Sequence, residues 1–142
     1  MPGKFKFHIL GAKLPFGNLA SNITYEGFIP EGQLNSFFVT MDAGIFPVFS
    51  GRGMKQKIFE SLCRSFPVIA PRISIGEYDL KNGQNFIEAN SVDEFASSII
   101  SLNNVILRKE LSIGADQFTA ANFNRESFVK ILNNLCQRKK LL

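Results

Sequence analysis

The sequence predicts an α/β fold with a mostly parallel sheet flanked by helices. Short apolar segments that fit strands alternate along the chain with segments whose apolar residues recur at helical spacing. The run over 43–49 is nearly all apolar, as expected of a parallel strand that is covered on both faces. Such alternation of buried strands and helices is typical of a layered α/β domain.

The composition fits a single domain over residues 1–142. Hydrophobic residues make up 45% and charged residues 20% of the chain, close to globular averages. The net charge of +4 fits an anionic ligand, a nucleic acid or an acidic membrane surface, and does not choose among them. The sequence has neither an apolar run long enough for a membrane span nor the pattern of a signal peptide, so we expect a cytoplasmic protein.

The first predicted elements are two strands and a helix. Residues 4–10 alternate apolar and polar side chains, which predicts a strand, and 22–27 predicts a second one. Pro30 favours the start of a helix. His8 lies on the second face of the first strand, and we expect a partly buried structural imidazole rather than a catalytic one.

The middle of the chain predicts a strand, a glycine turn, a helix and another strand. The strand over 43–49, whose regular pairing Pro47 should end, is followed by the turn at 50–53, and 67–70 predicts the next strand. The helix between them carries an apolar stripe: Ile58, Phe59, Leu62 and Cys63. Residues 71–83 are polar and rich in turn formers, which indicates a connection.

The C-terminal part predicts a weak strand over 84–89 and then helices. Ser91 and Glu94 form a Ser-x-x-Glu capping box at the start of the first helix. Helical patterns follow over 104–121 and 124–137. The apolar stripe of the last helix has two open uses: packing into the domain, which we favour, or peripheral contact with a membrane surface.

Neither metal-ligand nor disulfide spacing is present. The chain has one histidine and two cysteines, and no metal or cofactor is expected. We expect Cys63 and Cys136 to be buried free thiols.

The turn after the third predicted strand has the composition of a phosphate site. Gly51 and Gly53 allow the backbone to approach a ligand closely. The helix that follows offers free N–H groups and a positive dipole end. Arg52, Lys55 and Lys57 add charge-assisted contacts, which suggests a nucleotide-linked ligand with a diphosphate.

A carboxylate follows about one helical turn later. The spacing of Lys57 and Glu60 places them on neighbouring parts of one helix face, where Glu60 can hold a sugar hydroxyl. An alternative stays open, because glycine turns before helices are common. In that case Lys57 and Glu60 form a surface ion pair worth about 0.3 kcal/mol.

Residues 51–60, followed by 67–70, resemble the donor-binding signature of the group 1 glycosyltransferases, which are sugar transferases of the two-domain GT-B fold. Further segments are similar to the family in order and spacing: 7–11, 22–30, 42–47 and 90–102. The resemblance spans residues 5–105. It implies a Rossmann-like sheet and a nucleotide-sugar-binding domain over 1–142, equivalent to most of the C-terminal half of a GT-B enzyme.

The resemblance also implies roles for individual residues. Glu60 matches a glutamate that hydrogen-bonds the ribose hydroxyls, and the backbone over 53–56 matches the part that meets the diphosphate and the donor sugar. Phe28 and Ile29 match the segment that lines the base. The remaining donor-binding residues are Gly51, Arg52, Gly53, Met54, Lys55 and Lys57. No catalytic residue is assigned.

One departure from the family concerns Arg52. It stands where the family's E-x7-E motif has its first glutamate, which contacts the donor sugar. One branch of the family has the form G-x-G-x-x-x-K-x-x-E, which this chain fits with Lys57 as its lysine.

The function implied is transfer of a sugar from a nucleotide-diphosphate sugar to a glycan or lipid-linked acceptor, in polysaccharide biosynthesis. An acceptor-binding half is expected in cis or as a partner subunit, and we expect the isolated chain to be inactive, because transfer needs both reactants held in line. The alternative is a non-catalytic nucleotide-binding or interaction module that inherited the fold. Nucleic-acid binding is not expected, because the aromatic residues fit a core rather than a stacking surface.

Overall fold

The structure is a computed structural model that describes residues 5–11, 17–51, 55–76, 78–124, 126 and 129. The chain divides into two compact units, Met1–Thr40 and Met41–Leu142, and each is described by itself. A single nucleotide-sugar-binding domain over 1–142 stays a prediction.

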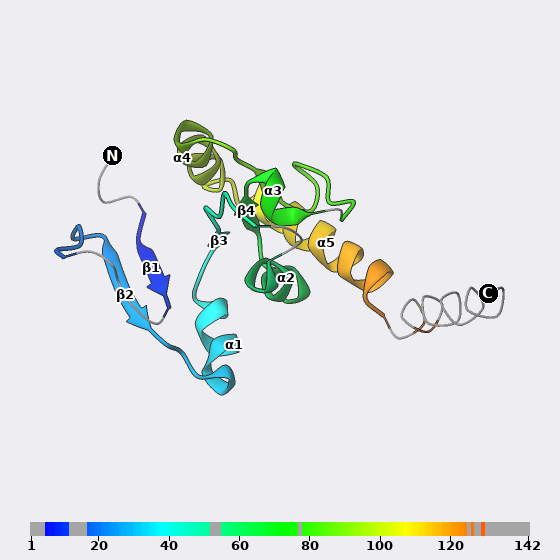
Figure 1. Cartoon of the computed structure of the whole chain (residues 1–142), viewed down its shortest axis with the longest axis horizontal. Helices are drawn as coiled ribbons and strands as arrows, with labels where there is room; N and C mark the ends of the chain where they lie inside the picture. The colour runs from blue at the N-terminus through cyan, green and yellow to red at the C-terminus, as the bar shows by residue number, and fades with distance from the viewer. Residues whose placement is uncertain are drawn as a thin grey trace. The chain divides into compact units, whose positions relative to one another are not determined.

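The first unit contains two parallel strands and a helix (Figure 1). Strand β1 (Phe7–Leu10) pairs in parallel with β2 (Ile23–Gly27), and α1 (Glu31–Val39) follows with Pro30 at its N-cap. These elements confirm the strands and the helix start predicted from the sequence.

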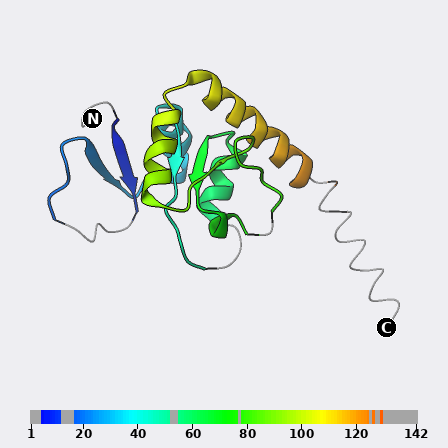
Figure 2. The same cartoon turned by 90° about the horizontal axis from the view of Figure 1, so that it is seen from above.

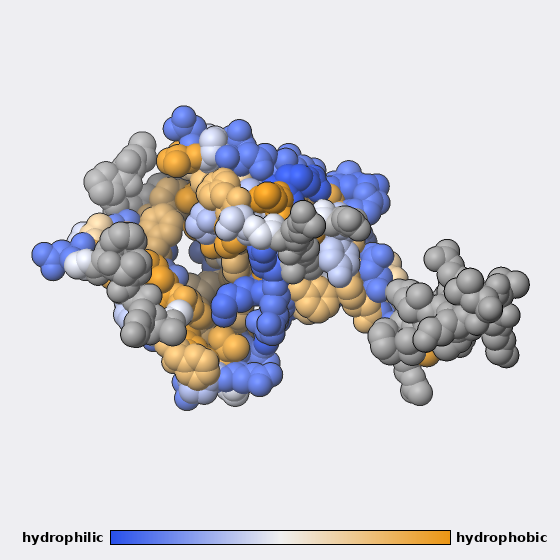
Figure 3. Space-filling view, in the orientation of Figure 1, coloured by the Kyte–Doolittle hydropathy of each residue, from blue (hydrophilic) through white to orange (hydrophobic). Residues whose placement is uncertain are grey.

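This unit has little interior of its own. None of its described residues is fully buried, and Val39 is 86% exposed. Figure 3 shows hydrophobic residues on the visible face over α1. A two-stranded sheet is marginal alone in water, and polar contacts add support: the Tyr25 hydroxyl donates to the Gly11 carbonyl at 2.7 Å.

The second unit is built on a parallel sheet of three strands. Its order is β3 (Gly44–Ile45), β4 (Val68–Ala70) and β5 (Ile87–Glu88), so β4 is central. Every residue of β4 is buried. The parallel α/β architecture predicted from the sequence is therefore confirmed.

Four helices complete this unit within the described residues (Figure 2). They are α2 (Gln56–Cys63), α3 (Arg72–Ile75), α4 (Val92–Ser101) and α5 (Val105–Asn122). None of the helices in the described ranges is long and apolar enough to cross a membrane.

The core lies on both faces of β4, because successive residues of a strand point to opposite sides. Val68 and Ala70 face one cluster and Ile69 faces the other. The first cluster includes Ile58, Leu62, Ile75, Phe86, Ala115 and Phe118. The second includes Ala89, Phe95, Leu102 and Leu111. Helices thus cover both sides of the sheet, as a parallel sheet requires.

A glycine inside α5 lets a connecting loop approach this helix. A Cβ atom on Gly114 would collide with the backbone carbonyl of Gln84. The Asn85 side chain donates to the Gly114 carbonyl at 2.9 Å, which fixes the contact.

The capping box predicted at the start of α4 is present in modified form. The Glu94 N–H donates to the Ser91 hydroxyl at 3.3 Å, as predicted. The Glu94 carboxylate accepts from the N–H of Asn90 at 2.7 Å, one residue before the usual N-cap partner.

The expectation of a doubly buried strand over 43–49 was wrong. Only Gly44 and Ile45 form β3, which lies at an edge of the described sheet. Pro47 has no N–H for a ladder bond, and Phe49 is 50% exposed. The strand buried on both faces is β4.

Two other predictions need correction, and two lie outside the described residues. The segment 71–83 contains the short helix α3, which the turn-forming composition concealed. Cys63 is exposed rather than buried, because Ile58 and Leu62 take the core-facing side of α2. Cys136 and nearly all of the predicted helix 124–137 lie outside the described residues.

Candidate functional site

The carboxyl ends of three parallel strands meet at one edge of the second unit's sheet, where open α/β sheets bind ligands. The glycine turn follows β3 after Phe49. Arg72 comes two residues after the end of β4, and Asn90 two residues after the end of β5. The residues of these three connections are therefore candidates for a site.

The described part of the glycine turn brings a cation close to the backbone. Gly51 has a φ of +92°, in the left-handed region that favours glycine. A Cβ atom at this position would collide with the Lys55 ammonium, so the Lys55 side chain folds back over Gly51. Arg52, Gly53 and Met54 lie outside the described residues, and their predicted roles stay predictions.

The start of α2 is electropositive. Lys55 is the N-cap residue, no side chain caps the helix, and its first turn contains no acidic residue. Lys57 is exposed. Neither lysine takes part in an ion pair among the described residues. Two ammonium groups therefore add to the positive end of the helix dipole, which favours an anion here.

Glu60 lies on a partly exposed face of α2. Its carboxylate accepts from the Gln56 side chain at 3.3 Å, whereas Ile58 and Leu62 are fully buried. The alternative ion pair with Lys57 is not formed in the described structure. Glu60 thus points away from the core, but its contact with a ribose stays a prediction.

The thiol at the end of α2 is not activated. Partial burial raises the pKa of Cys63, the nearby Arg64 guanidinium opposes this shift, and Glu60 adds to it. A raised pKa disfavours the reactive thiolate.

The two residues predicted to line a base follow β2 in the first unit. Gly27 has a φ of +67°, and Phe28 after it is 83% exposed. Ile29 is half-buried. Phe28 and Ile29 belong to the first unit and Gly51 and Glu60 to the second, so the role of Phe28 and Ile29 stays a prediction.

The single histidine has a protein partner in the same unit. His8 Nδ1 lies 2.7 Å from a Glu26 carboxylate oxygen, and the ring meets the edge of Phe37. His8 is half-buried, as expected.

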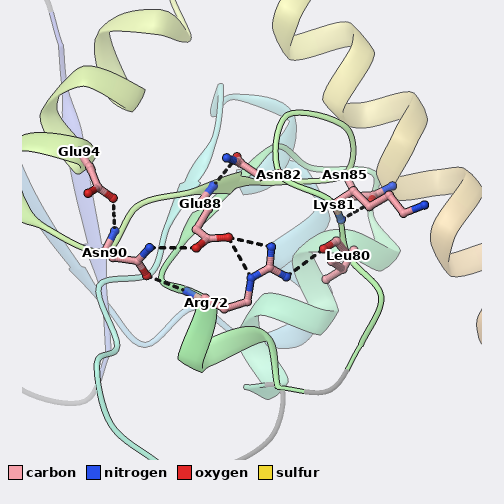
Figure 4. A network of polar contacts seen from close by, with 8 residues as sticks. All are labelled: Arg72, Leu80, Lys81, Asn82, Asn85, Glu88, Asn90 and Glu94. Carbon is pink, nitrogen blue, oxygen red and sulfur yellow. Dashed lines mark hydrogen bonds and ion pairs between the residues drawn. The ribbon is translucent and has the colours of Figure 1, made fainter.

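A polar network joins the ends of β4 and β5 (Figure 4). The Arg72 Nε and a terminal nitrogen donate to one Glu88 oxygen at 2.8 and 2.7 Å. Its other terminal nitrogen donates to the Leu80 carbonyl at 2.9 Å, and the guanidinium lies over the Phe86 ring.

Asn90 completes the same network. Its side-chain oxygen accepts from the Arg72 N–H at 3.0 Å, and its amide donates to Glu88 at 2.9 Å. The hydrogen bond from Asn90, aided by Arg72, lowers the pKa of Glu88. Sequence reasoning missed this network. The available signal was an arginine just after one predicted parallel strand and a glutamate near the end of the next.

A buried serine links the network's helix to the glycine turn. The Ser74 hydroxyl of α3 donates to the Val48 carbonyl, and the Ser74 carbonyl accepts from the Lys55 N–H at 3.2 Å. Sequence reasoning also missed Ser74, because 71–83 was interpreted as a connection.

Residues 2–104 match the protein family described as "Glycosyl transferases group 1". The chain belongs to this family. No curated protein sequence matches the chain at a significant level.

Two solved structures show that this group 1 glycosyltransferase chain has the fold of a C-terminal GT-B domain. The first is the C-terminal domain of a glycosyl transferase group 1 family protein (LpcC) from Francisella tularensis, with a TM-score of 0.62 and 17% identity over 73% of this chain. The second is TarM, with a TM-score of 0.73 and 23% identity over 92% of this chain. The match covers 55% of the LpcC chain and 28% of the TarM chain.

Proposed function

We propose that this chain is the donor-binding domain of a group 1 glycosyltransferase. It transfers a sugar from a nucleotide-diphosphate sugar to a glycan or lipid-linked acceptor when an acceptor-binding half is supplied in cis or by a partner subunit. The protein acts in the cytoplasm.

The site at the start of α2 carries this proposal. The diphosphate lies against Gly51 and the first amides of the helix, with Lys55 and Lys57 beside it. These groups stabilise the negative charge that grows on the diphosphate as it leaves, and they need little rearrangement to do so. Family membership supports a nucleotide-sugar donor as the source of that diphosphate.

The other donor contacts extend the proposal along the nucleotide. Glu60, one turn further along α2, accepts hydrogen bonds from the ribose hydroxyls. Phe28, 83% exposed, offers an unused aromatic face for the base. Ile29 lies next to it in sequence and contributes apolar surface.

The chemistry needs both halves of the enzyme. The acceptor oxygen forms a bond to the anomeric carbon, the bond from that carbon to the diphosphate oxygen breaks, the nucleoside diphosphate leaves, and the hydroxyl proton passes to it or to water. This chain supplies contacts to the donor only, so by itself it binds the nucleotide without turnover.

Calorimetric titration of the full chain with UDP and GDP tests the proposal, with circular dichroism showing that the protein is folded. We expect one of the two nucleotides to bind with a 1:1 stoichiometry. The binding should weaken in Lys55→Ala and not in Lys109→Ala, because Lys109 is an exposed lysine on α5 outside the site. Absence of binding by either nucleotide at millimolar concentration contradicts the proposal.

A second candidate is a non-catalytic nucleotide-binding or interaction module with an inherited fold. Arg52, at the position of a donor-sugar glutamate, favours it. The two candidates differ when an acceptor-binding half is added, from adjoining sequence or a co-purifying partner. Transfer of labelled sugar by the combination rules out the non-catalytic module, and binding without transfer favours it.

A further inference from the structure

Ser74 contacts both described ends of the glycine turn. Its hydroxyl donates to the carbonyl of Val48, where the chain enters the turn. Its carbonyl accepts from the N–H of Lys55 at 3.2 Å, where the chain leaves the turn and α2 begins. One residue therefore bridges the base of this turn.

The hydroxyl of Ser74 bonds to a segment that is distant in sequence. Helical serines commonly donate to the carbonyl four residues earlier, as Ser61 and Ser112 do in α2 and α5. Ser74 instead reaches a carbonyl 26 residues away in sequence. The side chain is fully buried, so its polar atom needs such a partner, and removing the hydroxyl leaves the Val48 carbonyl without it.

The helix that carries Ser74 is itself fixed to the edge of the sheet. Arg72, the first residue of α3, donates its N–H to Asn90 and its guanidinium to Glu88 and Leu80 (Figure 4). Ser74 is thus attached to the ends of β4 and β5 through a short and well-bonded helix.

We propose that Ser74 is a positioning residue for donor binding. It closes the glycine turn at its base and fixes the distance between the turn's entry and the start of α2. Gly51, the Lys55 ammonium and the first amides of α2 are then presented to a diphosphate in one geometry before it binds. Preorganisation of this kind improves affinity by reducing the ordering cost of binding. The inference rests on the proposed function.

Ser74→Ala tests this role, with Ser112→Ala as the matched control that removes a hydroxyl-to-carbonyl bond in α5. We expect Ser74→Ala to weaken binding of the preferred nucleotide, UDP or GDP, by about fivefold or more in calorimetry below the melting temperature, because the turn is less ordered. The control should leave the affinity unchanged.

Amide hydrogen exchange gives a readout that needs no ligand. In Ser74→Ala the Lys55 amide should exchange about tenfold faster or more, because the loosened turn opens its hydrogen bond locally. The control should leave it unchanged. If Ser74→Ala does not fold, Ser74→Cys takes its place, since a thiol of similar size is only a weak donor. Ser74→Thr, which keeps the hydroxyl, should restore both properties towards wild type.

The outcomes separate this inference from the proposed function. If the wild type binds nucleotide and Ser74→Ala binds equally well, or if the Lys55 amide is equally protected in both, the inference is wrong and the proposed function stands. If the wild type binds neither UDP nor GDP, the proposed function fails and the positioning role for donor binding fails with it, whereas a changed exchange rate still shows that Ser74 orders the turn.

Discussion

Two polar regions at the same sheet edge differ in where their charges find partners. At the ends of β4 and β5, Arg72, Glu88 and Asn90 bond to one another and to the backbone. At the end of β3, Lys55 and Lys57 form no ion pair among the described residues, and no side chain caps α2. The first region satisfies itself, whereas the second leaves two lysines that meet the charge of a ligand in the proposed function.

This difference suggests separate roles in stability and in ligand binding for the two sets of charged residues. This network contributes to stability, because losing Arg72 takes a partner from the half-buried Glu88 and from the carbonyl of the buried Leu80. Cations beside a helix N-terminus that form no ion pair with a described residue contribute little to stability and favour anion binding. Changes in the first region should therefore alter unfolding, and changes in the second should alter affinity.

The largest expected effect is on stability, from Arg72→Met. It removes the guanidinium contacts to Glu88, which keeps its bond from Asn90, and the guanidinium bond to the Leu80 carbonyl, so the free energy of unfolding should fall by about 2 kcal/mol. Urea denaturation followed by circular dichroism measures it. Lys109→Met, a change at an exposed site, should stay within about 0.5 kcal/mol of wild type. Equal stability of the two variants would show that the network is dispensable.

Lys55→Ala should have the next largest effect, and on affinity alone. Loss of a charge-assisted contact to phosphate should weaken nucleotide binding about tenfold, or about 1.4 kcal/mol. Unfolding should change by less than about 0.5 kcal/mol, because the side chain forms no ion pair with any residue that the structure describes. A large loss of stability with unchanged affinity would reverse the roles assigned to the two regions.

Glu60→Gln should have a smaller and more selective effect. We expect affinity for UDP or GDP to fall about fivefold, since a ribose hydroxyl loses a charged acceptor, worth about 1 kcal/mol at a partly exposed site. Affinity for inorganic pyrophosphate should not fall, because it has no ribose. Glu110→Gln, at an exposed glutamate on α5, serves as the control. Equal losses of affinity for UDP and pyrophosphate would contradict the proposed contact between Glu60 and the ribose.

The smallest effect concerns pH. The pKa of Glu88 is lowered below its usual value of 4.5, first by Asn90 and then by Arg72. Its stabilising contribution is therefore fully present above that value and is lost as the pH falls through the lower pKa of the folded state. The difference in stability between wild type and Glu88→Gln should stay constant from neutral pH down to pH 4.5 and should shrink below it. A gap that does not change with pH would contradict this assignment.

Much of the fold could be predicted because local signals agreed with the final packing. Apolar spacing placed Ile58 and Leu62 on the core side of α2, and the Ser-x-x-Glu pattern located the start of α4. The run over 43–49 misled because hydrophobicity alone does not distinguish an edge strand from a central one. The sheet order that decides this comes from pairing across distant segments.

The candidate site could be predicted only where its groups are neighbours in sequence. Gly51, Lys55 and Glu60 lie within one turn and one helix, so their spacing was informative. Ser74 reaches Val48, and Arg72 reaches Glu88, across long sequence separations through a helix that has no strong sequence signal. Those contacts depend on how three strand ends meet.

Nuclear magnetic resonance of the 15N-labelled chain titrated with UDP and with GDP tests the central claim most directly. The account predicts that the preferred nucleotide shifts the amide signals of Gly51 and of residues 55–60 progressively, whereas signals from residues 110–122 of α5 stay in place. Saturable shifts confined to other parts of the chain, with Gly51 and the start of α2 unaffected, would contradict it.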